Sequence, residues 1–128
     1  MSAQQHILVV DDDDNVRDVL VEMIREHGYR VSWTVDGKST REFLQGNDPV
    51  DVVVLDVLLP GESGADLVLY VKKLGLALVM ISGSPDALEF AEANNLQKLN
   101  KPFRSHELID ALMKALRNGE PGRRSKYP

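Results

Sequence analysis

The segment VVVLD at residues 52–56 decides the fold of this chain. Three valines and a leucine follow one another without an intervening polar residue, and a single aspartate, Asp56, ends the run. A strand that is apolar on both faces is typical of a parallel sheet covered by helices on both sides. The segment therefore predicts a buried strand that carries one carboxylate at its carboxyl end.

Similar apolar segments recur along the 128 residues, and helical patterns separate them. The strand-like segments are residues 7–10, 31–35, 52–55, 78–81 and, more weakly, 96–99. Apolar stripes predict helices that end at Gly28, Gly46 and Gly75, a helix that begins at Ser84-Pro85-Asp86, and a last helix over 108–116. Five strand–helix repeats predict a single α/β domain, a five-stranded parallel doubly wound sheet with five helices.

The composition excludes several classes of protein. Hydrophobic residues make up 43% and charged residues 27%, which is ordinary for a globular chain. The absence of cysteine excludes a disulfide scaffold, a zinc-thiolate site and a cysteine nucleophile. No apolar stretch approaches the roughly 20 residues of a membrane span, and no signal pattern opens the chain. We therefore expect a cytoplasmic protein without a membrane partner.

The net charge of −5 is unevenly distributed along the chain. The last ten residues hold Arg123, Arg124 and Lys126 against Glu120, so the remainder is more acidic than the whole. An acidic body is a poor ligand for nucleic acid, whose phosphates require cations. We expect a domain over residues 1–118 and a flexible basic tail over residues 119–128.

Polar residues follow four of the five predicted strands. The acidic run 11–14 follows the first strand, Asp56 the third, Ser82-Gly83 the fourth and Asn100-Lys101-Pro102 the fifth. The carboxyl ends of parallel strands lie at one edge of the sheet, where this class of fold binds its ligands. Carboxylates, a hydroxyl and an ammonium are therefore expected to converge there.

This set of side chains suits the transfer of a phosphoryl group. Neighbouring carboxylates repel one another unless a cation neutralises them, and all-oxygen ligands favour Mg²⁺. Lys101 supplies a positive charge for a phosphate oxygen, Ser82 a hydrogen-bond donor and Asp56 a nucleophile. The simpler alternatives are that Asp56 caps a turn before Pro60 and that Asp13 or Asp14 caps a helix.

Four motifs occur in the order found in a known family. They are ILVVDDD (7–13), VVVLDVLLPGESG (52–64), MISG (80–83) and NKPF (100–103). With them the chain resembles, over roughly residues 5–118, the receiver domain of two-component response regulators. The resemblance implies a flavodoxin-like strand order, 2-1-3-4-5.

The resemblance also assigns roles to individual residues. Asp56 matches the phosphoacceptor that becomes 4-aspartylphosphate, Ser82 the switch hydroxyl and Lys101 the phosphate-pairing lysine. Asp12 matches the direct ligand of Mg²⁺ (or Mn²⁺), Asp11 acts mainly through water, and Asp56 and the backbone carbonyl of Leu58 complete the metal site. The bond before Pro102 is expected to be cis.

The partners implied are those of a phosphorelay. A sensor histidine kinase or a histidine phosphotransfer protein donates the phosphoryl group, and a downstream protein responds to it. A homodimer through the last two helices is a further expectation. The chain is expected to be a regulator that catalyses only its own phosphorylation and slow dephosphorylation, and without an output domain it is stand-alone or belongs to a hybrid protein.

The sequence departs from the family pattern at several points. Lys98 stands where relatives often carry a Tyr or Phe that moves inward with the switch hydroxyl, and a long cation resists burial there. The spacings between Asp56, Ser82 and Lys101 predict an abbreviated exit from the third helix and a short or irregular fourth helix. We also hypothesise that Leu58 and Ser84, beside Gly83, tune how fast water removes the phosphoryl group.

Three alternatives remain open at this stage. Asp11, Asp13, Asn15 and Glu22 match an EF-hand calcium loop, although Val16 replaces the required glycine. Asp11-x-Asp13 after a first strand is also the signature of haloacid-dehalogenase-like phosphatases. The third alternative is a degenerate receiver that acts as an unphosphorylated interaction module. His6, His27 and His106 show no metal-binding spacing, and Trp33 is expected to pack beside the second strand or lie at its edge.

Overall fold

A computed structural model of the chain describes residues 4–56 and 64–117. Strands and helices alternate throughout this part of the chain. The strands are β1 His6–Val10, β2 Arg30–Thr34, β3 Val52–Asp56, β4 Ala77–Ser82 and β5 Gln97–Asn100. The helices are α1 Asp14–Glu26, α2 Gly37–Leu44, α3 Gly64–Lys73, α4 Pro85–Ala93 and α5 Ser105–Arg117.

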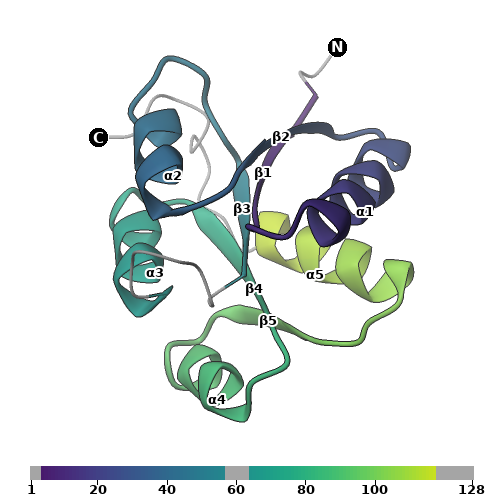
Figure 1. Ribbon diagram of the computed structural model, residues 1–128, viewed down its shortest axis with the longest axis vertical. Helices are drawn as coiled ribbons and strands as arrows, with labels where there is room; N and C mark the ends of the chain where they lie inside the picture. The colour runs from purple at the N-terminus through teal and green to yellow at the C-terminus, as the bar shows by residue number, and fades with distance from the viewer. Residues whose placement is uncertain (1–3, 57–63, 118–128) are drawn as a thin grey trace.

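The five strands form one parallel sheet in the order β2-β1-β3-β4-β5, which confirms the predicted topology. Helices α1 and α5 cover one face, and α2, α3 and α4 cover the other (Figure 1). The chain runs from β1 outward to β2 and then returns to β3 on the other side of β1. This reversal creates a switch point at the carboxyl edge of the sheet, where ligands bind in doubly wound folds.

Strand β1 shows why the central strands are mainly apolar. All five of its residues are buried. Ile7 and Val9 pack with α1 and α5, whereas Leu8 and Val10 pack with the three helices of the opposite face. Because alternate side chains enter two separate apolar clusters, an unpaired polar side chain would be costly on either face. The polar residue of β1, His6, has a hydrogen-bond partner at each ring nitrogen.

The helix boundaries follow from local capping. The Asp13 carboxylate accepts the N–H groups of Asn15 and Val16 and so begins α1, while Gly28, at φ +90°, follows its end. Because Asn15 and Glu22 lie within α1, residues 11–22 do not form a calcium loop, and the EF-hand alternative is wrong.

The exit from α3 and helix α4 itself are both short, as the spacing predicted. Three residues, 74–76, separate α3 from β4, and Gly75 has φ +79°. Ser84 caps α4 and Pro85 opens it. Helix α4 has nine residues, against thirteen in α1 and in α5, and it is a regular helix.

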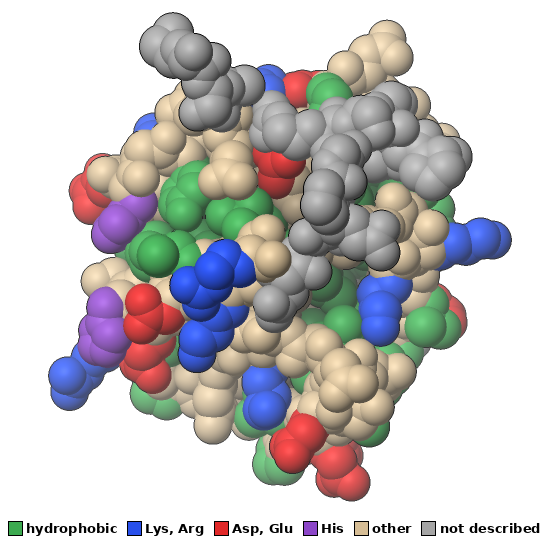
Figure 2. All heavy atoms as spheres, turned by 180° about the vertical axis from the view of Figure 1, so that it is seen from behind, with side chains coloured by type: hydrophobic (Ala, Val, Ile, Leu, Met, Phe, Trp, Pro, Cys, Tyr) green, Lys and Arg blue, Asp and Glu red, His purple; other side chains and the backbone are tan. Residues whose placement is uncertain are grey.

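The surface mixes charges of both signs. On the face that Figure 2 shows, the coloured acidic and basic side chains lie among apolar and neutral ones. No continuous basic patch covers this face within the coloured, described residues. This mixed distribution is compatible with the acidic net charge of −5.

Candidate functional site

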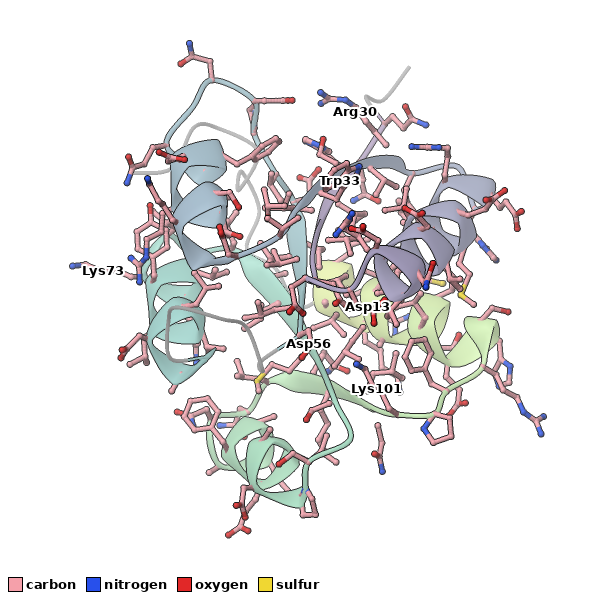
Figure 3. All side chains as sticks on the ribbon, viewed as in Figure 1. Asp13, Arg30, Trp33, Asp56, Lys73 and Lys101 are labelled. Carbon is pink, nitrogen blue, oxygen red and sulfur yellow. The ribbon has the colours of Figure 1, made fainter. Side chains whose placement is uncertain are left out.

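The predicted polar residues meet at the carboxyl edge of the sheet. Asp11 directly follows β1, Asp56 ends β3, Ser82 ends β4 and Lys101 directly follows β5. Figure 3 shows Asp56 and Lys101 near one another at this edge. The strand order explains the convergence, since β1, β3, β4 and β5 are consecutive neighbours in the sheet.

Asp56 and Lys101 form an ion pair across the end of β4. The Lys101 Nζ lies 3.2 Å from the Asp56 Oδ2. The Asp56 side chain is 11% exposed and the Lys101 side chain 35%, so the carboxylate is sheltered but reachable. The backbone N–H of Lys101 also donates to the carbonyl of Ser82 at 3.0 Å, which fixes the start of the lysine to β4. The Lys101–Pro102 peptide bond is cis, as predicted.

Asp11 is the most deeply buried acid of the site, with 1% of its surface exposed. Its Oδ1 accepts the Asp13 N–H at 2.9 Å. Its Oδ2 is buried and has no hydrogen-bond partner among the described residues. Burial raises the pKa of the Asp11 carboxyl, and the nearby charges of Asp56 and Asp12 act in the same direction against the Asp13 N–H and Lys101.

This environment fits a divalent cation. An unpartnered carboxylate oxygen beside a second carboxylate is a position that a hard cation, or water bound to it, can satisfy. Asp12 is exposed, and Leu58 lies outside the described residues. Within residues 4–56 and 64–117, no three His, Cys, Asp or Glu residues form a compact ligand cluster. A cation here therefore needs donors beyond such a cluster, as the predicted backbone carbonyl would be.

Ser82 is buried at the end of β4 and is connected to α4. Its Oγ accepts the backbone N–H of Ser84 at 2.9 Å. The Ser84 hydroxyl is itself occupied as the α4 cap, accepting the N–H of Ala87 at 3.4 Å. Between them, Gly83 lies beside the lysine: a Cβ added there would be 3.7 Å from the Lys101 Cβ, an ordinary contact.

Lys98 is on β5 but outside the site. Its side chain is 41% exposed, and its Nζ lies 3.8 Å from the Glu92 Oε2 of α4. It therefore does not occupy an apolar slot, in agreement with the expectation from its charge. At this position the chain has an exposed ion pair instead of a ring.

Sequence reasoning missed Arg17. This residue is 5% exposed, and its guanidinium donates to the Asp11 carbonyl at 3.0 Å. A signal was present, because Arg17 is spaced three and four residues from Leu20 and Val21 on the buried face of α1. A charged residue at such a position requires a buried polar partner.

The three histidines do not form a site within the described residues. His6 is fully buried, with its Nδ1 2.8 Å from the carbonyl of Pro49 and its Nε2 2.7 Å from the Ser32 Oγ. It is a hydrogen-bonded core residue. His27, which follows α1, and His106, in the first turn of α5, are exposed.

The chain belongs to the family of response regulator receiver domains, whose model matches residues 7–113. Proteins of this family are signalling regulators of two-component systems rather than classical enzymes, and they act with sensor kinases and downstream effectors. The family assignment agrees with the strand order and with the residues gathered at the carboxyl edge.

Two curated relatives illustrate the extent of the similarity. The transcriptional regulatory protein YbdJ of Bacillus subtilis is 36% identical over 107 residues, which are 80% of this chain and 47% of YbdJ. The DNA-binding response regulator MtrA of Mycolicibacterium smegmatis is 30% identical over 121 residues, 91% of this chain and 53% of MtrA. The chain thus spans about half the length of these relatives.

Solved structures show the same fold. A response regulator from Chloroflexus aurantiacus superposes with a TM-score of 0.82 at 29% identity, covering 91% of this chain and 100% of that one. The chemotaxis response regulator CheY4 of Vibrio cholerae gives a TM-score of 0.77 at 25% identity, with 89% and 100% covered. Within the described part of this chain, no helix is both long and apolar enough to cross a membrane.

Proposed function

We propose that this chain is a phosphoacceptor domain in which Asp56 receives a phosphoryl group from a phosphohistidine. The donor is a sensor histidine kinase or a histidine phosphotransfer protein. The observation that carries the proposal is the 3.2 Å contact between Lys101 Nζ and Asp56 Oδ2 at the carboxyl edge of a receiver fold. An Asp56 oxygen forms the bond to phosphorus as the phosphorus–nitrogen bond breaks, and the leaving imidazole nitrogen keeps the electron pair and takes up a proton.

Lys101 supplies fixed positive charge to this transfer. Its ammonium lies against the acceptor carboxylate, where the three phosphoryl oxygens would arrive. A prepositioned cation stabilises the charge that develops on those oxygens without having to reorganise during the reaction. The hydrogen bond from the Lys101 backbone N–H to the Ser82 carbonyl helps to hold the lysine beside Asp56.

Asp11, Asp12, Asp56 and the carbonyl of Leu58 are the residues that would hold Mg²⁺ or Mn²⁺. The unpartnered Asp11 Oδ2 and the raised pKa of that carboxyl support a cation at this position. When bound, the cation neutralises the acidic residues and the incoming phosphoryl oxygens. Receiver domains generally bind Mg²⁺ at the phosphorylation site, which supports the same choice.

Ser82 would transmit the phosphorylation of Asp56 to α4. Its hydroxyl oxygen accepts the Ser84 N–H, and Ser84 caps α4, so a reorientation toward a phosphoryl oxygen would alter the start of that helix. Gly83 leaves room beside Lys101 for this movement, and the Lys98–Glu92 pair joins α4 to β5 in place of an aromatic relay. Ser84 and Leu58 remain our candidates for tuning hydrolysis.

The wider biological setting is also part of the proposal. Residues 1–118 would form the receiver domain and residues 119–128 a basic tail that lies outside the described residues. The domain would work in the cytoplasm, control a partner protein and form a homodimer through α4 and α5. Several relatives are transcriptional regulators, but the acidic charge of this chain favours a protein partner over direct contact with nucleic acid.

The proposal is tested by locating the phosphoryl group. The purified chain is incubated with acetyl phosphate and Mg²⁺, and the modified peptide is identified by mass spectrometry. We expect a hydroxylamine-sensitive acyl phosphate on Asp56 that Asp56→Asn abolishes. The matched control, Asp110→Asn, changes an exposed acid on α5 and should label as the wild type does.

The same experiment separates the alternatives. Label on Asp11 rather than Asp56 would favour a haloacid-dehalogenase-like phosphatase. No label from any donor, together with no spectral response to beryllofluoride and Mg²⁺, would favour a degenerate receiver. Either result would overturn the phosphoacceptor role of Asp56.

A further inference from the structure

Arg17 holds the backbone of the residue that carries the buried carboxylate of the site. Its Nη1 donates to the Asp11 carbonyl at 3.0 Å, and its Nη2 donates to the Asp14 carboxylate. The side chain is buried, and its Nε has no hydrogen-bond partner in the described structure. Arg17 thus contacts the Asp11 backbone and not its carboxylate, so that any effect on the site is one of position.

The ring of Trp33 packs against the same guanidinium. It lies on the edge strand β2, paired with Val9, and the Arg17 Cζ is 4.1 Å from the centroid of its ring. Figure 3 shows Trp33 on β2 beside α1. Trp33 is half exposed, whereas Arg17 beneath it is buried. The ring therefore attracts the cation and also shields it from water. Shielding strengthens the hydrogen bonds that the guanidinium makes.

The Asp11 backbone is therefore joined to β2 by two routes. Its N–H donates directly to the carbonyl of Thr34 at 3.2 Å. Its carbonyl is held by Arg17, which rests on the neighbouring Trp33. With both peptide groups fixed, the carboxylate of Asp11 has little freedom to move when it meets a cation.

We propose that Arg17 and Trp33, which we call the Arg17–Trp33 clamp, are positioning residues that set the affinity of the site for its divalent cation. This inference rests on the proposed function, because it assumes that a cation binds beside Asp11. Neither residue contacts the acceptor carboxylate, so the clamp acts on binding of the cation and not on transfer at saturation. Trp33, the single tryptophan of the chain, then also reports binding through its fluorescence.

The test measures Mn²⁺ binding by the electron paramagnetic resonance signal of free Mn²⁺. Residues that orient metal ligands typically change affinity by about 10-fold to 100-fold. We expect Arg17→Lys and Trp33→Leu each to raise the Kd about tenfold, and Trp33→Phe, which keeps a ring, to recover most of this loss. At saturating Mn²⁺ all three variants should reach the wild-type level of phosphoryl incorporation.

Fluorescence supplies a second readout that a purely structural role would not move. In the wild type, the Trp33 emission should change with Mg²⁺ in a saturable manner. In Arg17→Lys, the change should move to a higher Mg²⁺ concentration because the guanidinium that connects the Trp33 ring to the Asp11 carbonyl is lost. The Mn²⁺ and Mg²⁺ titrations should rank the proteins in the same order.

The chain offers a matched control on the opposite face of the sheet. The Arg41 guanidinium of α2 lies 4.3 Å from the centroid of the Tyr70 ring of α3. Arg41→Lys and Tyr70→Leu remove a contact of the same type that does not involve Asp11. Both controls should leave the Mn²⁺ Kd within about twofold of the wild type.

The outcomes separate the clamp from the proposed function. If the wild type is labelled on Asp56 and binds Mn²⁺, and Arg17→Lys and Trp33→Leu are folded with unchanged Kd, the clamp alone is overturned. If Arg17→Lys does not fold, Trp33→Leu decides the question. If the wild type binds no Mn²⁺, the cation site fails, and the clamp fails with it.

Discussion

Lys98 and Lys101 show how strand position assigns different roles to the same residue type. Lys98 is exposed beside Glu92, whereas Lys101 follows the end of β5 and reaches Asp56. We expect Lys101→Met to slow phosphoryl incorporation on the order of 10²-fold, the usual effect of removing a prepositioned charge from a reacting anion. The rate is measured with acetyl phosphate at saturating Mg²⁺.

Lys98→Met is the control for this change. It removes the same charge from the same strand, but the ion pair it breaks is exposed and contributes little. Its rate should stay within about twofold of the wild type. Equal rates for Lys101→Met and the wild type would remove Lys101 from the proposed chemistry.

The buried acid Asp11 makes the stability of the protein dependent on pH. Its pKa is raised, chiefly by burial, so the folded protein binds this proton more tightly than the unfolded chain does. The contribution of Asp11 to stability therefore falls as the pH rises from the ordinary value of 3.8 through the raised pKa. Above that pKa the folded state carries the full penalty of an ionised, buried carboxylate.

Asp11→Asn removes this penalty and keeps an oxygen for the Asp13 N–H. Without divalent cations, we expect the variant to unfold at a higher urea concentration than the wild type at about pH 7, with a smaller difference at about pH 4. Circular dichroism in the presence of a chelator measures both midpoints. A variant that is less stable than the wild type at neutral pH would contradict this account of the site.

At the level of single residues, the polar side chains of the site were easier to predict than the residue that holds them in place. Asp56, Ser82 and Lys101 could be placed from their positions after strands, because strand ends in this fold share an edge. Arg17 could not, because its partner is a backbone carbonyl and its aromatic neighbour comes from another strand. The pattern of α1 marked Arg17 as buried but could not indicate what it touches.

Helix α1 depends on the conformation of Gly28, the second residue after its end. Gly28 has φ +90°, and a Cβ added there would meet no atom within 4 Å. The backbone alone therefore disfavours a side chain. We expect Gly28→Ala to lower the free energy of unfolding by about 1 kcal/mol, as measured by urea denaturation.

Gly28→Asn tests the cause of this loss. Asparagine tolerates the left-handed region better than alanine, although its side chain is larger. Its destabilisation should therefore be smaller than that of alanine. The reverse order would show that space, and not backbone conformation, limits this position.

For the whole molecule, hydrophobic pattern and turn residues were enough to predict the topology. The mainly apolar strands β1, β3 and β4 could be recognised because both faces of each are covered. The edge strands β2 and β5 have mixed patterns, and their predicted limits, 31–35 and 96–99, each differ by one residue from those of the structure. The sequence pattern predicts the second helix over residues 38–45, whereas α2 begins at Gly37, because the reciprocal cap between Asp36 and Ser39 was not recognised.

The register between β4 and β5 determines whether Lys101 can reach Asp56. Leu99 faces Ile81 and packs beneath α5, and two residues later Lys101 donates its N–H to Ser82. A slip of one residue would turn Leu99 to the opposite face and draw the ammonium away from the acceptor. If the proposed function is right, a chain with this wrong strand register would lack the contact between Lys101 and Asp56 and would accept no phosphoryl group.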